Sequence, residues 1–393
     1  MAEFNSRHHF ETIIIGGGLA GLLVAARLAE AGQRFLLLEE KEELGGYCRP
    51  QVHALGTFGF GFKSLPAHEA GHRAADFLES QLGFSLQRQE SDLPPITFEG
   101  GKFKPFLGFG SEPPPDIDEL EYYLFPRRLV LRFAPHTWIA HLREKIPAEQ
   151  IVMRSVVTRI LIEQGTSQGV MVNGAQTYTA ERLIYTGSKK ALAQLLPSGA
   201  LPTRLGQKLA KSPFWTAVGL DLVHAQTVSE SRALHVLRGG KEDASPCLGY
   251  FYEPGAELNL DATSRHAAQI SRWMTLVSAE GSEDPEITGA SVRKIKKQIK
   301  RAYPEALDHL LHERIYVANL SHGSCEIKLT AGVEVPGIAG LYLSGSGIGS
   351  GRNLIGVCEQ TQSLLNALGL DAAPAVFAQD AGESAQPPLS LDC

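Results

Sequence analysis

The sequence lacks the features that would direct the chain to a membrane, to export or to nucleic acid. No apolar run among its 393 residues reaches the ~18 residues of a membrane span. The N-terminus is polar and has no signal-peptide core, so export is not expected. The formal net charge is −6, from 37 basic and 43 acidic residues, which gives no basic excess for nucleic acid. These absences predict a cytoplasmic protein with neither a transmembrane segment nor a nucleic-acid partner.

Cysteine is scarce, and its spacing is typical of neither a disulfide framework nor a zinc site. The five cysteines are scattered, odd in number and without CxxC spacing: Cys48, Cys247, Cys325, Cys358 and Cys393. This usage predicts free thiols in a reducing compartment and no metal centre. The sequence also has no nucleophile elbow and no clustered carboxylate pair, so no motif identifies a catalytic residue.

Glycine, in contrast, is abundant, with 40 residues, and its N-terminal spacing is that of a dinucleotide-binding turn. A β-branched run at residues 12–15 predicts a buried strand, and Gly16, Gly18 and Gly21 follow it directly. Gly16 permits the tight turn and Gly18 lets the backbone approach a pyrophosphate. Gly21 lets the next helix lie close to the strand.

The elements after this turn complete a nucleotide-binding pattern. A helix is expected next, and its first N–H groups, at Leu19 and Ala20, would face phosphate oxygens. Residues 35–38 predict a second parallel strand, and Glu39 ends it, where an acid can bind a ribose 2′-OH. The adjacent Glu40 competes for that role, although we expect it to face solvent. Strand, glycines, helix, second strand and acid therefore occur in the order of a Rossmann-like unit.

A second glycine pair follows the acid. The run from Lys41 to Tyr47 contains Gly45 and Gly46. An acid, a few residues and a glycine pair resemble the flavoprotein superfamily of amine oxidases, protoporphyrinogen oxidases, phytoene desaturases and UDP-galactopyranose mutases. The resemblance implies FAD, because the second turn lets the backbone run along the diphosphate and ribityl chain. Relatives often have arginine after the pair; here Tyr47 stands there, and Arg49, two residues on, either supplies that charge or lies on the surface.

A central segment, residues 151–200, resembles the superfamily's second contribution to the FAD site. The turn pairs Gln164-Gly165 and Asn173-Gly174 predict hairpins, and a strand that enters a helix follows them. The resemblance implies that the backbone of Val157 brackets the adenine. It adds two further cofactor-binding candidates at the strand end, Thr186 and Gly187.

The third segment lies near the C-terminus, where "GLYLSG" predicts a buried strand that ends at Gly345. A glycine-rich loop and a helix from about residue 355 to 367 follow. The resemblance implies that this helix points its N-terminus, at Gly356 and Val357, toward the flavin N1–C2=O edge. The positive end of a helix dipole would stabilise an anionic reduced flavin there. Relatives often have an acid after the glycine; Ser346 stands in its place and can bond to the ribityl phosphate region.

The predicted fold class is α/β, with a Rossmann-like parallel-sheet FAD domain and an α+β cap that has a mixed or antiparallel sheet. The FAD domain would combine residues 8–55, 151–200 and 325–370, the cap residues 56–150 and 201–324, and residues 371–393 would form a disordered tail. Dense aromatic residues in the cap suit either an apolar cavity or core packing. The basic run from Arg293 to Arg301 predicts a solvated helix face, with peripheral membrane contact as the minority interpretation.

A flavin enzyme of this kind mainly needs a substrate carbon held over N5 in a dry cavity. We therefore expect an FAD-dependent oxidoreductase that takes hydride from a small or apolar substrate, by C–C desaturation or amine-type dehydrogenation. Amine-oxidising relatives usually carry a lysine in a cap strand, and the matching stretch "PFWTAVGLDLVH" has none. That absence favours chemistry like that of the desaturases or protoporphyrinogen oxidases. Lys63 and Lys328 are the candidates for a polar group near the flavin.

Two alternatives stay open. The chain could be a mutase-like enzyme in which flavin acts without net redox change; Arg127, Arg128 and Arg132 would suit a nucleotide-sugar diphosphate. It could also be a degenerate FAD-binding protein with a structural or partner-binding role, which the departures at Tyr47 and Ser346 allow. The substrate, the electron acceptor and the oligomeric state do not follow from the sequence.

Overall fold

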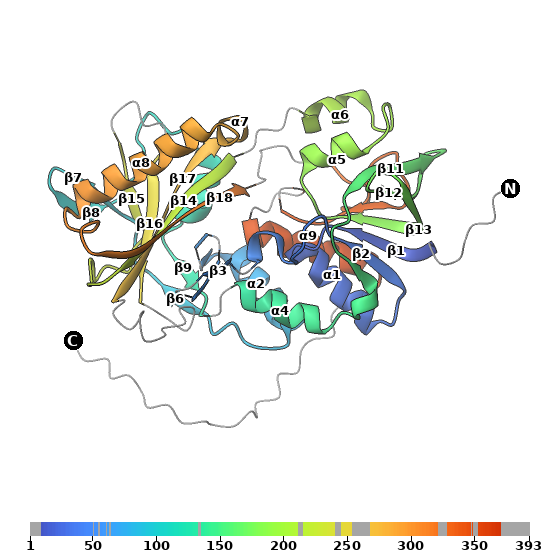
Figure 1. The fold of residues 1–393 in the computed structure, drawn as a ribbon, viewed down its shortest axis with the longest axis horizontal. Helices are drawn as coiled ribbons and strands as arrows, with labels where there is room; N and C mark the ends of the chain where they lie inside the picture. The colour runs from blue at the N-terminus through green and yellow to red at the C-terminus, as the bar shows by residue number, and fades with distance from the viewer. Residues whose placement is uncertain are drawn as a thin grey trace, which may run out of the picture.

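The computed structural model describes residues 9–49, 51–53, 56–59, 61–62, 64–132, 135–210, 215–239, 245–253, 268–320, 328–346, 348 and 353–370. Lys63, Cys325, Cys393 and the tail 371–393 therefore lie outside the described residues. Two sheets lie at opposite ends of the molecule, with helices and short strands between them (Figure 1).

The first sheet is parallel at its centre and contains the N-terminal βαβ unit. Its strands run in the order β10-β2-β1-β13, and β12 and β11 extend it as an antiparallel meander, while β19 pairs with the last part of β13. The bounds are β1 (His9–Ile15), β2 (Phe35–Leu38), β10 (Ile151–Val152), β11 (Val157–Glu163), β12 (Thr166–Val172), β13 (Gln176–Tyr185) and β19 (Leu341–Leu343). Both predicted hairpins are confirmed, because Gln164-Gly165 and Asn173-Gly174 link these strands with positive φ at all four residues.

Helices cover one face of this sheet. They are α1 (Leu19–Glu30), α2 (Glu69–Leu82), α4 (Pro135–Glu144) and α9 (Asn353–Ala367). Apolar side chains of all four helices share one core with Ile14, Leu37 and Ile184 of the strands. α1 is apolar on most sides because it is packed between the sheet and the other helices. α2 and α4 come from the segment 56–150, so part of that segment contributes to the core of the first sheet rather than to the second.

The opposite face of the first sheet is covered by the meander and two short helices. Ile13, Leu36 and Leu183 point to this side and pack with residues of β11 and β12. The helices are α5 (Lys189–Leu195) and α6 (Thr203–Ala210). Alternate residues of β1, β2 and β13 therefore face two separate cores, as expected for central parallel strands covered on both faces.

The second sheet has the order β18-β14-β17-β16-β15-β7-β8 and is antiparallel except for the β15–β7 pair. Its strands are β7 (Ile96–Glu99), β8 (Lys102–Pro105), β14 (Trp215–His224), β15 (His235–Leu237), β16 (Cys247–Tyr252), β17 (Gln269–Ser278) and β18 (Leu310–Leu320). The helix α8 (Pro285–Ala302) covers one face (Figure 1) and buries Ile295 and Ile299 there, while Arg293, Lys297 and Lys300 are exposed. The α/β class with a parallel Rossmann-like sheet and a separate, largely antiparallel sheet is confirmed.

Short elements connect the two sheets. They are the hairpin β3 (Gln51–His53) and β4 (Gly56–Phe58), the small sheet of β5 (Ser64–Pro66), β9 (Arg128–Val130) and β6 (Gln89–Ser91), the helices α3 (Ile117–Leu124) and α7 (Ala279–Ser282), and the 3₁₀ turns η2 (Gly46–Cys48) and η3 (Ala148–Gln150). Within the described ranges, no helix is both long and apolar enough to cross a membrane.

Candidate functional site

The carboxyl ends of four parallel strands meet at one edge of the first sheet, here called the crest. Ile15 is paired with Leu38 and Tyr185, and Tyr185 is paired with Leu343, so β1, β2, β13 and β19 end in one row. The crest therefore consists of the residues that follow these ends: Gly16 to Gly18, Glu39, Thr186 to Gly187, and Ser344 to Ser346. Ligands of open α/β sheets bind outside the carboxyl ends of the strands.

The first glycine turn has the geometry that a diphosphate requires. Gly16 has φ +108°, and a Cβ atom at Gly21 would lie 2.0 Å from the carbonyl oxygen of Gly16, so α1 approaches β1 as closely as glycine permits. A Cβ atom at Gly18 would meet no atom within 4 Å. Gly18 is the N-cap of α1, and no side chain caps that helix end. The turn thus presents open space to the N–H groups that begin α1, at Leu19 and Ala20.

The second glycine pair lies directly against the first turn. The Gly45 N–H donates to the Gly17 carbonyl over 2.7 Å, and Gly18 and Gly45 form a parallel bridge. Gly45 has φ +109° and Gly46 has φ +54°. A Cβ atom at Gly46 would come within 3.3 Å of the Gly18 Cα. Two glycine turns 27 residues apart at Gly18 and Gly45 are therefore built as one surface.

Glu39 lies at the crest beside the first turn. It is 7% exposed, and its carboxylate accepts hydrogen bonds from the Gly17 N–H at 2.7 Å and the Lys41 N–H at 2.9 Å. Its neighbour Glu40 is exposed. Ser155 donates its N–H to the Glu39 carbonyl over 2.8 Å, which brings the chain that enters β11 at Val157 to the same end of the crest.

The residues after the second glycine pair occupy the turn η2. Tyr47 is half exposed and Arg49 is partly buried, and the Arg49 backbone would lie 3.0 Å from a Cβ atom placed at Gly45. Burial raises the pKa of the Cys48 thiol to about 12 and also raises the pKa of Cys358. Both thiols are therefore protonated at neutral pH, and the described cysteines Cys48, Cys247 and Cys358 are free, as predicted.

The second and third segments reach the crest next to the first turn. The Thr186 hydroxyl donates toward the carbonyls of Ile15 and Gly16, at 3.0 and 3.1 Å. The Ser344 N–H donates to the Tyr185 carbonyl over 3.0 Å, which places Gly345 and Ser346 beside β13. Gly187 is exposed directly after Thr186. Gly356 and Val357 are the fourth and fifth residues of α9, because this helix begins at Asn353 and not near residue 355 as predicted.

The lysine candidates gain no support from the described geometry. Lys63 lies outside the described residues, and Lys328 is exposed in the chain before the bridge between Thr330 and Glu334. The strand β14, where amine-oxidising relatives usually carry lysine, holds no lysine at all.

A sequence pattern that the motif analysis missed occurs at His68 to His72, which has the letters of HExxH. In a zinc protease both histidines lie on one helix face. Here His68 is the N-cap of α2, and its Nδ1 accepts from the Gly71 N–H at 3.2 Å, while Glu69 pairs with Arg73. Among the described residues no group of three His, Cys, Asp or Glu side chains could hold a metal ion. The pattern therefore serves as a helix cap.

The second sheet carries a buried row of charged residues that the sequence did not reveal. Asp221 on β14 is paired in register with Arg272 on β17 and Arg314 on β18. Its carboxylate accepts from Arg272 Nε at 2.8 Å and from Arg314 Nη2 at 2.6 Å. Burial alone would lower the pKa of Arg272, but the Asp221 carboxylate raises it above the ordinary value. Asp221 thus forms buried salt bridges with both arginines.

This triad holds the loop that follows β4. Arg272 Nη1 donates to the Gly61 carbonyl at 2.8 Å, and Arg314 Nη2 donates to the Gly59 carbonyl at 2.7 Å. The Arg314 guanidinium also lies over the Phe58 ring, 5.0 Å from its centroid. The loop connects β4 to β5, so the triad links the second sheet to the short elements that lie between the two large sheets.

A cavity of about 580 Å³ lies between the second sheet and the small sheet of β5, β9 and β6. Its apolar lining includes Phe58, Leu234, Phe251 and Ile270, and its polar lining includes Ser64, Arg128, Tyr250 and Arg272. Burial raises the pKa of Tyr250, so its phenol is neutral and can donate a hydrogen bond. The predicted aromatic residues thus divide between cavity and core: Phe58 and Tyr250 line this cavity, while Phe62 packs edge-to-face on Tyr123 and Tyr250.

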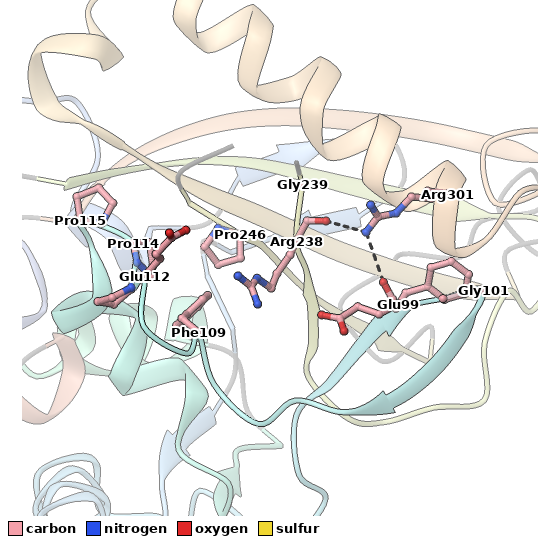
Figure 2. Close-up of a pocket in the computed structure, with 13 residues that line it drawn as sticks. Glu99, Gly101, Phe109, Glu112, Pro114, Pro115, Arg238, Gly239, Pro246 and Arg301 are labelled. Atoms are coloured by element: carbon pink, nitrogen blue, oxygen red, sulfur yellow. Dashed lines mark hydrogen bonds between the residues drawn. The ribbon is translucent and has the colours of Figure 1, made fainter. Parts of the chain in front are cut away.

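A second cavity, of about 740 Å³, lies at the β7–β8 edge of the second sheet, on the side away from the first sheet (Figures 1 and 2). Figure 2 shows Arg301 donating to the carbonyl of Arg238, at 2.7 Å. The Arg238 guanidinium lies over the Phe109 ring, and Glu99 pairs with Lys104 at 2.6 Å. This cavity is lined by prolines, glycines, two phenylalanines and four charged residues, and none of the lining residues belongs to the crest.

Comparisons with known proteins agree with this architecture. Residues 14–80 match the family described as NAD(P)-binding Rossmann-like domain. All-trans-retinol 13,14-reductase from Homo sapiens is 24% identical over 266 residues, which cover 67% of this chain and 36% of that protein. The chain therefore matches little more than a third of the length of this curated relative.

Two solved structures share the fold over most of the chain. A proposed protoporphyrinogen oxidase from Exiguobacterium sp. superposes with a TM-score of 0.63 at 14% identity, covering 93% of this chain and 99% of that one. Cyclohexylamine oxidase from Brevibacterium oxydans superposes with a TM-score of 0.61 at 14% identity, covering 92% and 99%. The resemblance to the superfamily that the glycine motifs indicated is thus confirmed at the level of the fold.

Proposed function

We propose that the chain binds FAD along the crest and uses it to take hydride from a small or apolar substrate. The observation that carries the proposal is the contact between the two glycine turns, made by the Gly45 N–H and the Gly17 carbonyl at 2.7 Å. Side by side, these turns offer a continuous stretch of side-chain-free backbone, with open space at Gly18. An extended diphosphate and ribityl chain fits such a stretch.

The same contact favours FAD over a nicotinamide dinucleotide. A nicotinamide dehydrogenase needs the first turn for its pyrophosphate and an acid for its ribose. It does not need a second glycine turn with φ values of +109° and +54° packed against the first. The likeness of the fold to cyclohexylamine oxidase and to the proposed protoporphyrinogen oxidase supports this choice.

When bound, FAD supplies the hydride acceptor, and the residues of this chain bind and orient the reactants. In this proposal the N–H groups at Leu19 and Ala20 hold the diphosphate, Glu39 holds the adenosine ribose, and Arg49 adds positive charge. Val157 and Thr186 to Gly187 border the adenine and diphosphate, and Gly345 and Ser346 border the ribityl chain. The N-terminus of α9, at Gly356 and Val357, faces the flavin ring and favours negative charge on it.

The cavity of about 580 Å³ is the proposed substrate site. Its size and largely apolar lining favour a substrate of moderate size with extended apolar surface. The absence of lysine from β14 supports desaturase-like C–C chemistry over amine oxidation. A curated relative named all-trans-retinol 13,14-reductase supports the same choice. We therefore propose C–C dehydrogenation as the reaction, with amine-type dehydrogenation as the alternative.

The first experiment is spectroscopic. The full-length protein, purified and supplied with FAD, should show the two visible absorption bands of bound flavin. Anaerobic addition of apolar substrates with saturated C–C bonds should bleach these bands without added reductant. A mutase-like enzyme would instead turn over only after pre-reduction and leave the flavin redox state unchanged. A colourless protein that takes up no FAD would refute the proposal.

The second experiment tests where the diphosphate lies. Gly18→Ala adds one methyl group to the open space without contact with protein atoms, so the fold should persist. The same methyl group would occupy the diphosphate site, and we expect FAD affinity to fall at least about tenfold. Gly206→Ala in α6 is the matched control, because its Cβ would meet only Leu201, at 4.0 Å, and Gly206 is not a crest residue. Unchanged FAD affinity in Gly18→Ala would place the cofactor elsewhere.

A further inference from the structure

One arginine in the proposed substrate cavity differs from the others in its surroundings. Arg128, on β9, is only 4% exposed and lines the cavity. Its Nη2 donates to the carbonyl and the hydroxyl of Ser64, both at 3.0 Å, and Nε donates to the same hydroxyl at 3.3 Å. Nη1 donates to the Tyr122 carbonyl. Among the residues that the structure describes, no carboxylate contacts Arg128. Its guanidinium is surrounded by neutral groups, namely these oxygens and the Tyr122 ring, whose centroid lies 5.5 Å away.

The other charged residues around this cavity are all paired. Glu90 and Asp92 both bind Arg127, at 2.7 and 2.9 Å, and Glu253 binds Arg232. These three acids are exposed, with 42%, 76% and 74% of their side chains accessible, so they lie at the rim and are screened by water. Arg128, in contrast, lies at the buried floor.

The floor of the cavity therefore has an excess of positive charge. Arg272 lines it as well, but its charge is compensated by Asp221. Arg128 adds a second buried guanidinium, which no carboxylate of the described residues contacts. A buried cation without a counter-charge is unfavourable unless a ligand supplies one, and charges in such a site interact more strongly than they would in water.

We propose that the substrate is an apolar molecule with a carboxylate, and that Arg128 binds this carboxylate. A planar guanidinium whose existing partners are neutral oxygens is suited to charge-assisted hydrogen bonds with a carboxylate. Ser64 and Tyr250 lie in the same lining and supply hydroxyl groups beside it. The apolar part of the molecule lies along Phe58 and Ile270. This assignment rests on the proposed function for its catalytic meaning, while the binding itself is measured independently of any flavin reaction.

The test compares two probes that share one polyene chain and differ in the charge of the head group. cis-Parinarate is a fluorescent polyene carboxylate, and its methyl ester has the same chain without the charge. Both are titrated into the full-length, FAD-supplied protein, and fluorescence reports entry into an apolar cavity. The wild-type protein should bind the acid about tenfold to a hundredfold more tightly than the ester, the usual range for a hydrogen bond to a charged group. Equal affinity for acid and ester would overturn the assignment without any variant.

Variants then locate the effect. Arg128→Gln should remove the preference for the acid and leave the affinity for the ester within about threefold, whereas Arg128→Lys, which keeps the charge, should retain part of the preference. Arg301→Gln is the matched control, because Arg301 also donates to backbone carbonyls but lines the second cavity. Loss of the preference in Arg301→Gln, or its survival in a folded Arg128→Gln, would contradict the assignment. The outcome is separate from flavin bleaching, so a failure here and a failure of the proposed reaction are distinguishable.

Discussion

The carboxylate of Glu39 accepts the N–H of Gly17 at a distance of 2.7 Å, inside the first glycine turn. Its other oxygen accepts the Lys41 N–H at 2.9 Å. The acid that the sequence identifies as a ribose ligand thus also fixes the backbone of the turn that faces the diphosphate. A carboxylate has about four lone-pair sites, so two backbone contacts leave room for a ribose hydroxyl.

Glu39→Gln should therefore destabilise the glycine turn and weaken the binding of FAD. The amide oxygen can replace only one of two charge-assisted acceptors, and its NH₂ group faces a backbone N–H. We expect FAD affinity to fall about tenfold or more and the free energy of unfolding to fall by about 1–2 kcal/mol. Flavin titration and urea unfolding measure the two effects. Glu40→Gln, at the exposed neighbouring position, should change neither, and a loss of the same size there would contradict the assignment.

Gly21 is expected to matter for folding rather than for the cofactor alone. A Cβ atom there would lie 2.0 Å from the Gly16 carbonyl oxygen, so Gly21→Ala must push α1 away from β1. Forcing extra volume into a packed position costs about 1–3 kcal/mol. Thermal unfolding with and without FAD should show Gly21→Ala destabilised in both conditions. Gly18→Ala should be as stable as the wild type without FAD. This difference would distinguish the folding role of Gly21 from the cofactor-binding role of Gly18.

The buried triad gives a third prediction. Asp221→Asn leaves Arg272 and Arg314 as two buried positive charges with no acid between them. Removing one partner of a buried pair costs about 3–5 kcal/mol. Because these arginines hold the carbonyls of Gly61 and Gly59, loosening of the loop should also speed FAD release.

Denaturant unfolding and the rate of FAD loss measure these effects, and a partly exposed pair provides the control. Glu313→Gln breaks the contact between Glu313 of β18 and Lys296 of α8, and such a pair should contribute no more than about 1 kcal/mol. If Asp221→Asn cost as little as Glu313→Gln, the triad would have no role in holding the loop.

The nucleotide-binding crest could be predicted from the sequence because its signals are local. Gly16, Gly18 and Gly21 lie within six residues of one another, and the turn between β1 and α1 dictates their roles without knowledge of the rest of the fold. Hairpins at Gln164-Gly165 and Asn173-Gly174 are local in the same sense, since positive φ at both central residues selects the turn.

The cavity floor could not be predicted, because its residues meet only through strand register. Asp221 lies 51 residues before Arg272 and 93 before Arg314, and a shift of one residue in either pairing would turn their side chains to the opposite face. The sequence singled out Arg128 only together with Arg127 and Arg132, as residues suited to a nucleotide-sugar diphosphate. Its neighbour Arg127 binds two acids at the surface while Arg128 is buried, a difference that depends on the strand β9 and its partner Ser64.

The sequence did not show that α2 packs against the first sheet, because that packing joins segments that are distant in the chain. Its sequence lies in the segment expected to form the cap, yet Ala74 and Leu78 share a core with Leu22 of α1 and Leu364 of α9. Amphipathic periodicity indicates that a helix has a buried face but does not indicate which sheet covers it. The letters HExxH at the start of α2 likewise do not predict a metal site by themselves, because the function of a motif depends on how its side chains are placed.

Two buried histidines of the second sheet predict how stability depends on pH. Burial lowers the pKa of His224 to about 4 and that of His235 to about 4. His224 contacts the Ala306 carbonyl and the Ser271 hydroxyl, and His235 contacts the Tyr303 hydroxyl at 2.6 Å. In the unfolded chain a histidine takes up a proton near pH 6.5, whereas in the folded protein these two stay neutral until about pH 4. Stability should therefore be full above pH 6.5 and fall as the pH is lowered from there toward 4.

The contribution of His224 to the pH dependence of stability is the difference between the wild type and His224→Gln. Urea unfolding is measured at pH 7 and at pH 5 for the wild type and for His224→Gln. Most carboxylates stay ionised over this interval. The wild type should lose about 1–2 kcal/mol more than the variant over this interval, because the variant has no proton to take up on unfolding. His309→Gln, which replaces an exposed histidine near the end of β14, should follow the wild type. An identical pH dependence for the wild type and His224→Gln would mean that His224 is protonated in the folded protein, and would contradict its burial beside Ala306 and Ser271.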